Sequence, residues 1–304
     1  MPDNKTAELL FIINPSSGTK SKTNWKETVN DFFKNRPETF KIYELNGEEN
    51  GNAELKKQLT EIKPKKVIAV GGDGTVKTVA EQLLHTEMIL GILPAGSANG
   101  MAKELNIPEN VEKAFDIILN GSTEKIDVLK VNDNDISIHL SDMGLNASLI
   151  HYFEKGNQRG MLGYAKVALK VLLKKRLMRL DIKLNGETIL RAAYMVVLAN
   201  AKKYGTGAEI NPEGKLTDGK FEVVVVRKLT VLHLFRMLIS HKPFNRECIE
   251  IFQTDKAVVT SNKKNHFQVD GEYCGKTNTI TTEILAASLN VLVPAATAAE
   301  VHEK

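Results

Sequence analysis

The stretch VIAVGGDGTVKTVAEQLLHTEMILGILPAGSANGMAKEL, at Val67–Leu105, contains two apolar runs that are each followed by a glycine-rich turn. It opens with an apolar run, Val67–Val70, of the length and composition that a buried parallel strand presents. The glycine-rich segment Gly71–Thr75 follows directly, and apolar residues then recur at helical spacing from Val76 to Leu84. The sequence therefore predicts a strand that passes through a glycine-rich turn into an amphipathic helix.

A second copy of this design follows at once. Ile89–Leu93 is another apolar run, Pro94–Gly100 is a second glycine-containing turn, and Met101–Leu105 has helical composition. Glycines permit close backbone approach and positive φ angles. Free backbone N–H groups and the helix dipole attract anions at the start of a helix. Two such turns at neighbouring strand ends therefore indicate a site for the phosphates of a nucleotide.

These turns match neither of the two common phosphate-binding motifs. Gly72-Asp73-Gly74 begins like G-x-G-x-x-G, but Lys77 stands where the third glycine belongs, and no G-x-x-x-x-G-K-[ST] occurs in the chain. The distinguishing feature is the carboxylate of Asp73 between two glycines. Beside phosphates, such a carboxylate is suited to hold Mg²⁺ or to accept a proton from an attacking hydroxyl. The alternative is that Asp73 only caps the helix that follows.

Four segments together resemble the catalytic family of the diacylglycerol kinases, which includes sphingosine and ceramide kinases and soluble bacterial lipid kinases. They are INPSSG at 13–18, GGDGT at 71–75, LPAGSANGMAKELNIP at 93–108 and VDGE at 269–272. GGDGT alone is shared with NAD kinases and phosphofructokinases, whereas all four in this order are highly specific. The resemblance covers nearly the whole chain, and it implies a kinase that transfers the γ-phosphoryl group of ATP to a lipid hydroxyl.

The resemblance also implies which residues form the site. Asp73 and Glu272 are the catalytic candidates. The family places the proton acceptor at Glu272, and two alternatives stay open, namely Asp73 as the base and a plain turn residue at Glu272. The ATP-binding candidates come from three N-terminal loops and are Asn14, Gly18, Gly71, Gly72, Asp73, Gly74, Thr75, Lys77, Gly96, Ser97 and Asn99. For Lys77, a phosphate ligand in the first helical turn and an ordinary surface lysine are both open.

The expected cofactors are ATP and Mg²⁺. The segment KLTDGKF at 215–221 resembles a family segment that binds a structural Mg²⁺. In that resemblance the ligands are the carboxylate of Asp218 and the backbone carbonyls of Lys215 and Lys220, and Asp127 reaches the metal through water. A plain turn at the aspartate is the alternative. The seven histidines show no H-E-x-x-H spacing, so a zinc site is not expected.

The order of predicted elements divides the chain into two domains. Alternating strand and helix patterns predict an α/β domain with a mostly parallel sheet at residues 1–125, and the resemblance implies that residues 286–304 return to it. Residues 126–285 carry strand-like runs such as Ile136–Leu140 and a hairpin turn at Asn185-Gly186. They predict a mostly antiparallel, β-sandwich-like domain, which the resemblance makes the lipid-substrate domain.

Composition favours an ordinary globular protein of the cytoplasm. The 304 residues are 42% hydrophobic and 26% charged, and the two cysteines show no metal-ligand spacing and no disulfide framework. The N-terminus lacks the basic and apolar regions of a secretion signal, and no apolar run approaches membrane-spanning length. A net charge of +4 is too small to indicate nucleic acid as a partner. We expect a cytoplasmic protein that associates with the membrane peripherally.

The partners expected are a lipid substrate and an anionic membrane surface. A predicted helix at 164–179 carries six basic residues and no acid, which anionic lipids attract by about 1 kcal/mol per basic residue; a solvated helix face is the alternative. The sequence does not reveal the oligomeric state, and a homodimer stays open. Two rival functions also stay open, namely a soluble-metabolite kinase of the NAD-kinase type and a non-catalytic nucleotide or lipid sensor.

The lipid alcohol itself is open between diacylglycerol, a sphingoid base and another lipid. Family members commonly have an aspartate after the asparagine of the second glycine loop, and Gly100 replaces it here. The loop sequence GSANGMAKEL is more similar to the sphingosine-kinase version of that loop.

Overall fold

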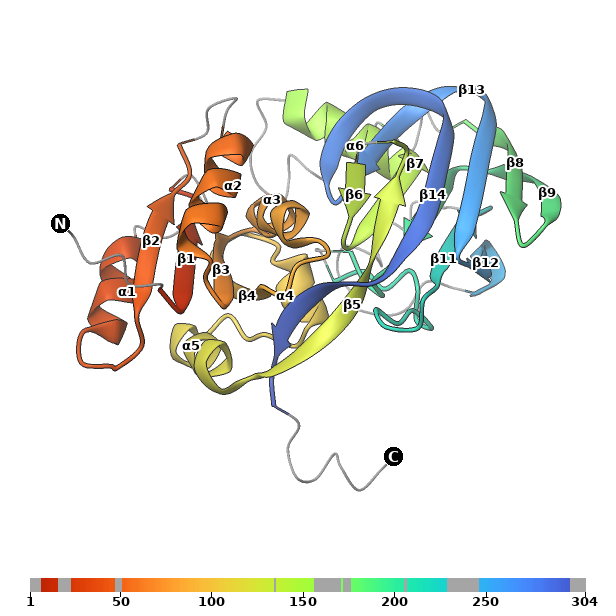
Figure 1. Ribbon diagram of the computed structural model, residues 1–304. Helices are drawn as coiled ribbons and strands as arrows, with labels where there is room; N and C mark the ends of the chain where they lie inside the picture. Colours follow the sequence, from red (N-terminus) through yellow and green to blue (C-terminus); the bar gives the residue numbers. More distant parts are fainter. Residues whose placement is uncertain are drawn as a thin grey trace. The chain divides into compact units, whose positions relative to one another are not determined.

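The computed structural model describes residues 7–15, 23–46, 51–133, 135–155, 171, 176–204, 207–228 and 246–295. The chain forms two compact units, Met1–Ile126 with Ser288–Lys304, and Asp127–Ala287. Figure 1 shows the elements of each unit. Among the described residues, no helix combines the length and the apolar character that crossing a bilayer requires.

The first unit is built on a parallel sheet with the strand order β14–β4–β3–β1–β2. Its strands are β1 (Leu9–Ile13), β2 (Phe40–Glu44), β3 (Lys66–Gly71), β4 (Ile89–Pro94) and the end of β14 (Glu272–Val293). Every residue of β1 is buried, as expected of a strand covered on both faces. The sheet confirms the α/β fold class predicted for this part of the chain.

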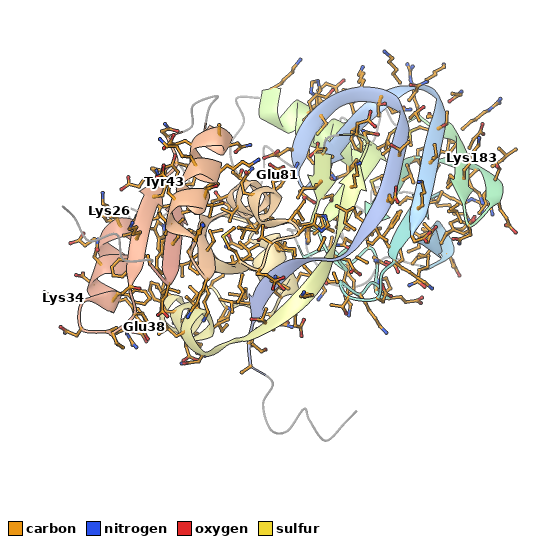
Figure 2. All side chains as sticks on the ribbon, in the orientation of Figure 1. Lys26, Lys34, Glu38, Tyr43, Glu81 and Lys183 are labelled. Carbon is orange, nitrogen blue, oxygen red and sulfur yellow. The ribbon has the colours of Figure 1, made fainter. Side chains whose placement is uncertain are left out.

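Helices cover both faces of this sheet (Figure 1). They are α1 (Trp25–Phe33), α2 (Gly51–Ile62), α3 (Asp73–Leu83), α4 (Gly100–Glu104) and α5 (Val111–Asn120). On one face the rings of Phe32 in α1 and Phe115 in α5 stack at 4.0 Å between centroids, and Phe11 of β1 packs against Phe115. On the other face α2 contacts α3. Lys26 of α1, labelled in Figure 2, pairs with Glu44 of β2 at 2.8 Å.

The second unit is mostly antiparallel. Its strands are the end of β5 (Ser122–Val131), β6 (Asp135–Ser137), β7 (Leu140–Gly144), β8 (Met178–Leu184), β9 (Glu187–Ala193), β10 (Met195–Ala199), β11 (Phe221–Val226), β12 (Ile249–Thr254), β13 (Lys256–Val269) and the start of β14. The order β12–β11–β10–β7–β13–β14 is extended by β8 beside β13 and by β5 beside β14. The predicted sandwich-like class is confirmed.

Two hydrophobic clusters explain the burial pattern of these strands. Val196 and Leu198 of β10 point into one cluster, and Met195 and Val197 point into the other, so β10 is covered on both faces. β8 instead alternates buried and exposed residues, and its Lys183 projects outward (Figure 2). Helix α6 (Leu145–Lys155) closes the second cluster with Leu145 and Leu149.

Two local predictions were wrong, and one helix was not predicted. The predicted strand Ile136–Leu140 is interrupted after Ser137, because the next amides bond to a side chain rather than to a neighbouring strand. The sequence did not predict α6. The basic helix predicted at 164–179 does not extend to its expected end, since Arg179 lies in β8; residues 164–170 and 172–175 lie outside the described residues.

Candidate active site

Three loops of the first unit meet at the carboxyl ends of β1, β3 and β4. Asn14 follows β1, and its Nδ2 donates a hydrogen bond to Oγ1 of Thr75 at 3.1 Å. The backbone N–H of Asn14 also donates to the carbonyl of Val70 at 3.2 Å. The first loop is therefore tied to the start of α3. Gly18, expected in the same loop as Asn14, lies outside the described residues.

The two glycine turns touch backbone to backbone. A Cβ atom on Gly96 would lie 2.5 Å from the Cα of Gly72, and one on Gly71 would lie 2.3 Å from Oγ1 of Thr75. The N–H of Ala95 donates to the carbonyl of Gly71 at 2.9 Å. A side chain at position 96 would separate the two turns, and one at position 71 would collide with Thr75 within the first turn, so both positions require glycine.

Asp73 joins the two turns through its side chain. It is the first residue of α3, whose N-cap is Gly72, and its Oδ1 accepts a hydrogen bond from the N–H of Met101 in α4 at 3.0 Å. The side chain therefore does not cap α3, which was the alternative reading of the sequence. Among the described residues, none donates a hydrogen bond to Asp73 Oδ2. That oxygen is available to a metal ion or a proton.

The other candidates of this unit shape the loops. Asn99 has a left-handed backbone, with φ of 51°. It closes its own loop, accepting from the N–H of Gly96 at 2.9 Å and donating to the carbonyl of Gly96 at 3.1 Å. Ser97 is exposed. Lys77 is buried in α3, so the expectation of an ordinary surface lysine is wrong, and its role as a phosphate ligand stays a prediction.

Glu272 lies in the second unit, directly after a tight turn. Asp270 and Gly271 form the turn between β13 and β14 with φ angles of 50° and 90°, and Val269 pairs with Glu272 across it. Oδ1 of Asp270 accepts from Oγ of Ser137 at 2.7 Å. The Asp270 carboxylate also accepts from three consecutive backbone amides, 138–140, at 2.9 to 3.1 Å. Asp270 is thus an anchor, whereas the side chain of Glu272 is exposed.

A buried carboxylate that sequence reasoning missed lies beneath this turn. Asp142 of β7 is fully buried, and Gln268 of β13 donates to it at 2.5 Å. Burial raises the pKa of Asp142 to about 6, and hydrogen bonds from Asn146, Gln268, the N–H of Ala147 and Tyr204 limit the rise. The signal available in the sequence was an aspartate inside the apolar run of β7.

The segment expected to hold Mg²⁺ offers hard oxygen donors. Asp127 is buried, and its two carboxylate oxygens accept from the N–H groups of Gly219 and Ala287, each at 2.7 Å. Asp218 accepts from the N–H of Lys220 at 3.1 Å and from Nε2 of Gln253 at 3.3 Å. Carboxylate oxygens suit Mg²⁺, but Asp127 holds the loop directly. No cluster of three His, Cys, Asp or Glu side chains able to bind a metal occurs in the described part of the chain.

The second unit also contains a pocket of about 310 Å³. Its lining combines apolar with basic side chains, including Leu145, Met178, Arg176, Lys264 and Lys276. His266 lies on the pocket wall and bonds through Nδ1 to the hydroxyl of Tyr273 at 2.8 Å. Burial, together with Lys276, His151 and Lys155, lowers the pKa of His266 to about 4. The histidine is therefore neutral near pH 7.

Two family models match the chain. The diacylglycerol kinase catalytic domain matches residues 8–131, and the YegS C-terminal NAD kinase beta sandwich-like domain matches residues 142–293. The three loops around Asp73 fall within the first match, and the turn that carries Glu272 falls within the second.

Similar proteins include an uncharacterized protein of Synechocystis sp., 29% identical over 241 residues, which are 75% of this chain and 54% of that protein. A diacylglycerol kinase of Bacillus subtilis (strain 168) is 26% identical over 217 residues, 69% of this chain and 71% of that one. A diacylglycerol kinase of Staphylococcus aureus (strain Newman) is 27% identical over 218 residues, 69% of each chain. The chain thus spans about half the length of the Synechocystis protein and more of the two kinases.

Solved structures show the same fold. The crystal structure of a diacylglycerol kinase from Bacillus anthracis str. Sterne superposes with a TM-score of 0.71 at 19% identity, covering 94% of this chain and 96% of that one.

Proposed function

Since this chain belongs to the diacylglycerol kinase catalytic domain family, we propose that it is a lipid kinase that transfers the γ-phosphoryl group of ATP to a lipid hydroxyl. The observation that carries the proposal is the contact between the two glycine turns, with Asp73 at the start of α3 and its Oδ2 without a hydrogen bond from any residue that the structure describes. Phosphoryl transfer depends mainly on positioning and charge stabilisation, and this arrangement suits both.

The first unit binds the nucleotide. The glycine backbone after β3 and β4 lets phosphates approach closely, and the N-terminus of α3 adds a favourable dipole. Asn14 and Thr75 hold the β1 loop at the same edge. Asp73 Oδ2 and the phosphates are the oxygen donors that would hold Mg²⁺, which when bound neutralises charge on the β- and γ-phosphates.

Glu272 accepts the proton of the lipid hydroxyl. As the hydroxyl oxygen bonds to the γ-phosphorus, the bond from that phosphorus to the bridging oxygen of ADP breaks, and the proton passes to the carboxylate. A carboxylate within hydrogen-bond reach assists this loss of a proton. Glu272 is exposed on a turn anchored by Asp270, so it is accessible to a substrate.

A neutral lipid alcohol of the diacylglycerol type suits the second unit better than a sphingoid base. Three cations, Arg176, Lys264 and Lys276, line the pocket, and no acid is among its described lining residues. They would repel the protonated amine of a sphingoid base, whereas apolar residues such as Leu145 and Met178 suit acyl chains. Peripheral attachment to an anionic membrane agrees with the same cations.

The test is transfer of label from γ-labelled ATP to a panel of lipids in mixed micelles, namely diacylglycerol, a sphingoid base and ceramide, with NAD as a soluble acceptor. We expect label on diacylglycerol and none with Asp73→Asn. Label on NAD alone would identify a kinase of the NAD-kinase type. Binding of ATP with no transfer to any acceptor would identify a sensor.

A further inference from the structure

We infer that Asp142 and Gln268 are positioning residues that fix the turn carrying Glu272. The inference rests on the proposed role of Glu272 as proton acceptor. Neither residue is exposed to a substrate, since Asp142 is fully buried and Gln268 is 1% exposed. Their action on the reaction therefore runs through the backbone of the turn.

Gln268 connects Asp142 to the turn through the two ends of its amide. Its Oε1 accepts from the N–H of Gly271 at 2.6 Å, and its Nε2 donates to Asp142 Oδ2 at 2.5 Å. An ionised carboxylate only accepts hydrogen bonds, so Asp142 selects the amide orientation that leaves the oxygen facing Gly271. The carbonyl of Leu140, which accepts from the same Nε2 at 3.3 Å, favours the same orientation. Asp142 and Gln268 are direct partners in the antiparallel register of β7 and β13, so the strand pairing holds them opposite each other.

Asp142 is itself held in one orientation. Its Oδ1 accepts from the N–H of Ala147 in the first turn of α6 at 2.9 Å. Its Oδ2 accepts from Nδ2 of Asn146 at 2.6 Å and from the hydroxyl of Tyr204 at 3.3 Å, in addition to Gln268. These donors surround the carboxylate and leave it no room to rotate without breaking a buried hydrogen bond.

The turn needs support because two successive residues, Asp270 and Gly271, have left-handed φ angles. One is not glycine, and a left-handed backbone costs free energy there. Asp270 is fixed through its carboxylate to the segment after β6. The second fixed point is the N–H of Gly271, which donates its hydrogen bond to Oε1 of Gln268. Glu272 follows directly, so both anchors determine where its Cα lies.

A buried carboxylate costs free energy that an apolar side chain of similar size would not. Asp142 carries this cost, as its raised pKa shows. An orienting role explains its presence, because its Oδ2 accepts from Nε2 of Gln268 at 2.5 Å, a shorter bond than the 3.3 Å bond from the same nitrogen to the carbonyl of Leu140.

An exchange of charge tests the inference. Asp142→Asn places an N–H opposite Nε2 of Gln268, so the Gln268 amide turns over. Its NH₂ group then faces the N–H of Gly271, and that hydrogen bond is lost. Gln268→Glu places two carboxylates together. In the double variant, Asn at 142 donates to Glu at 268, whose second oxygen accepts from Gly271. We expect each single variant to lower kcat by about 10- to 100-fold through misplacement with ATP affinity unchanged, and the double variant to recover most of the loss.

A second readout does not depend on activity. Hydrogen exchange of the Gly271 amide should be faster in both single variants than in the wild type, and in the double variant it should slow to the wild-type rate. Glu222→Gln is the matched control, because it also removes a buried carboxylate that accepts from side-chain amides, those of Asn211 at 2.5 Å and Gln253 at 3.1 Å, and neither of these partners belongs to the turn. It should leave kcat and Gly271 exchange unchanged. If Asp142→Asn fails to fold, Gln268→Met removes the side-chain bonds to Asp142, to Gly271 and to the carbonyl of Leu140 without burying a new charge.

The outcomes separate the two proposals. If Glu272→Gln keeps kcat, the base role of Glu272 fails, whereas Gly271 exchange still reports on the anchoring. If Glu272→Gln loses kcat but the single variants keep both kcat and Gly271 protection, the positioning role is overturned. Failure of the double variant to recover kcat and protection overturns it as well.

Discussion

Gly72 and Gly96 face each other so closely that a Cβ on Gly96 would lie 2.5 Å from the Cα of Gly72, while a Cβ on Gly72 would lie 3.2 Å from the Cα of Gly96. The atom in the way is backbone in both cases, so it cannot rotate aside as a side chain would. The contact is asymmetric, so an added Cβ is tolerated less well at Gly96 than at Gly72.

Gly96→Ala should therefore weaken ATP binding by at least about tenfold and destabilise the chain by about 1–3 kcal/mol, as overpacking usually does. Gly72→Ala should also weaken ATP binding and destabilise the chain, but by less. Isothermal titration with ATP and thermal unfolding measure both effects. Gly51→Ala is the control, because its Cβ would meet nothing closer than 3.7 Å. Equal ATP affinity in Gly96→Ala and wild type would contradict the site.

Asp73→Asn should fold normally and lose phosphoryl transfer by orders of magnitude. The amide oxygen can still accept from the N–H of Met101, which preserves the link between the turns. The negative charge needed by a metal ion or a proton is lost. Turnover of labelled ATP measures the loss of phosphoryl transfer, and the thermal midpoint measures whether the variant folds normally. Turnover near that of the wild type would remove Asp73 from the reaction.

Glu272→Gln should lower kcat strongly while ATP affinity and the thermal midpoint stay nearly unchanged. The side chain is exposed, so its replacement removes little packing, and it belongs to the second unit rather than to the loops around Asp73. Steady-state kinetics, with ATP and the lipid varied in turn, separate the effect on kcat from the effect on the KM for ATP. If this variant keeps kcat while Asp73→Asn abolishes it, Asp73 is the better candidate for the base.

Asp142 should make the free energy of unfolding fall as pH rises between about 4 and 6. The native carboxyl has a pKa of about 6, above the value of 3.8 for an unperturbed group, so the native state binds the proton more tightly than the unfolded state. The difference amounts to about 3 kcal/mol across this window. Urea unfolding of wild type and Asp142→Asn at several pH values isolates the effect, and parallel curves for the two proteins would contradict it.

The sequence predicted those parts of the protein that depend on local patterns. The apolar runs before Gly71 and Pro94 and the glycines after them required only neighbouring residues, and the alternation of helix and strand gave the parallel sheet. The pair of Asp142 and Gln268 could not be predicted, because the partners are 126 positions apart and meet only through the register of two strands. The interruption after Ser137 has the same origin, since Asp270 lies 133 positions away.

The last strand has a consequence for synthesis of the chain. β14 starts at the turn of the second unit, and its residues from Ser288 onward belong to the first unit. There Asn290 pairs with Ile89 of β4, and its Nδ2 donates to the carbonyl of Thr86, 204 positions earlier. The parallel sheet of the first unit therefore leaves the ribosome with one edge of β4 unpaired. That edge is covered only after the whole second unit has been synthesised, and until then it can pair with the strands of other nascent chains.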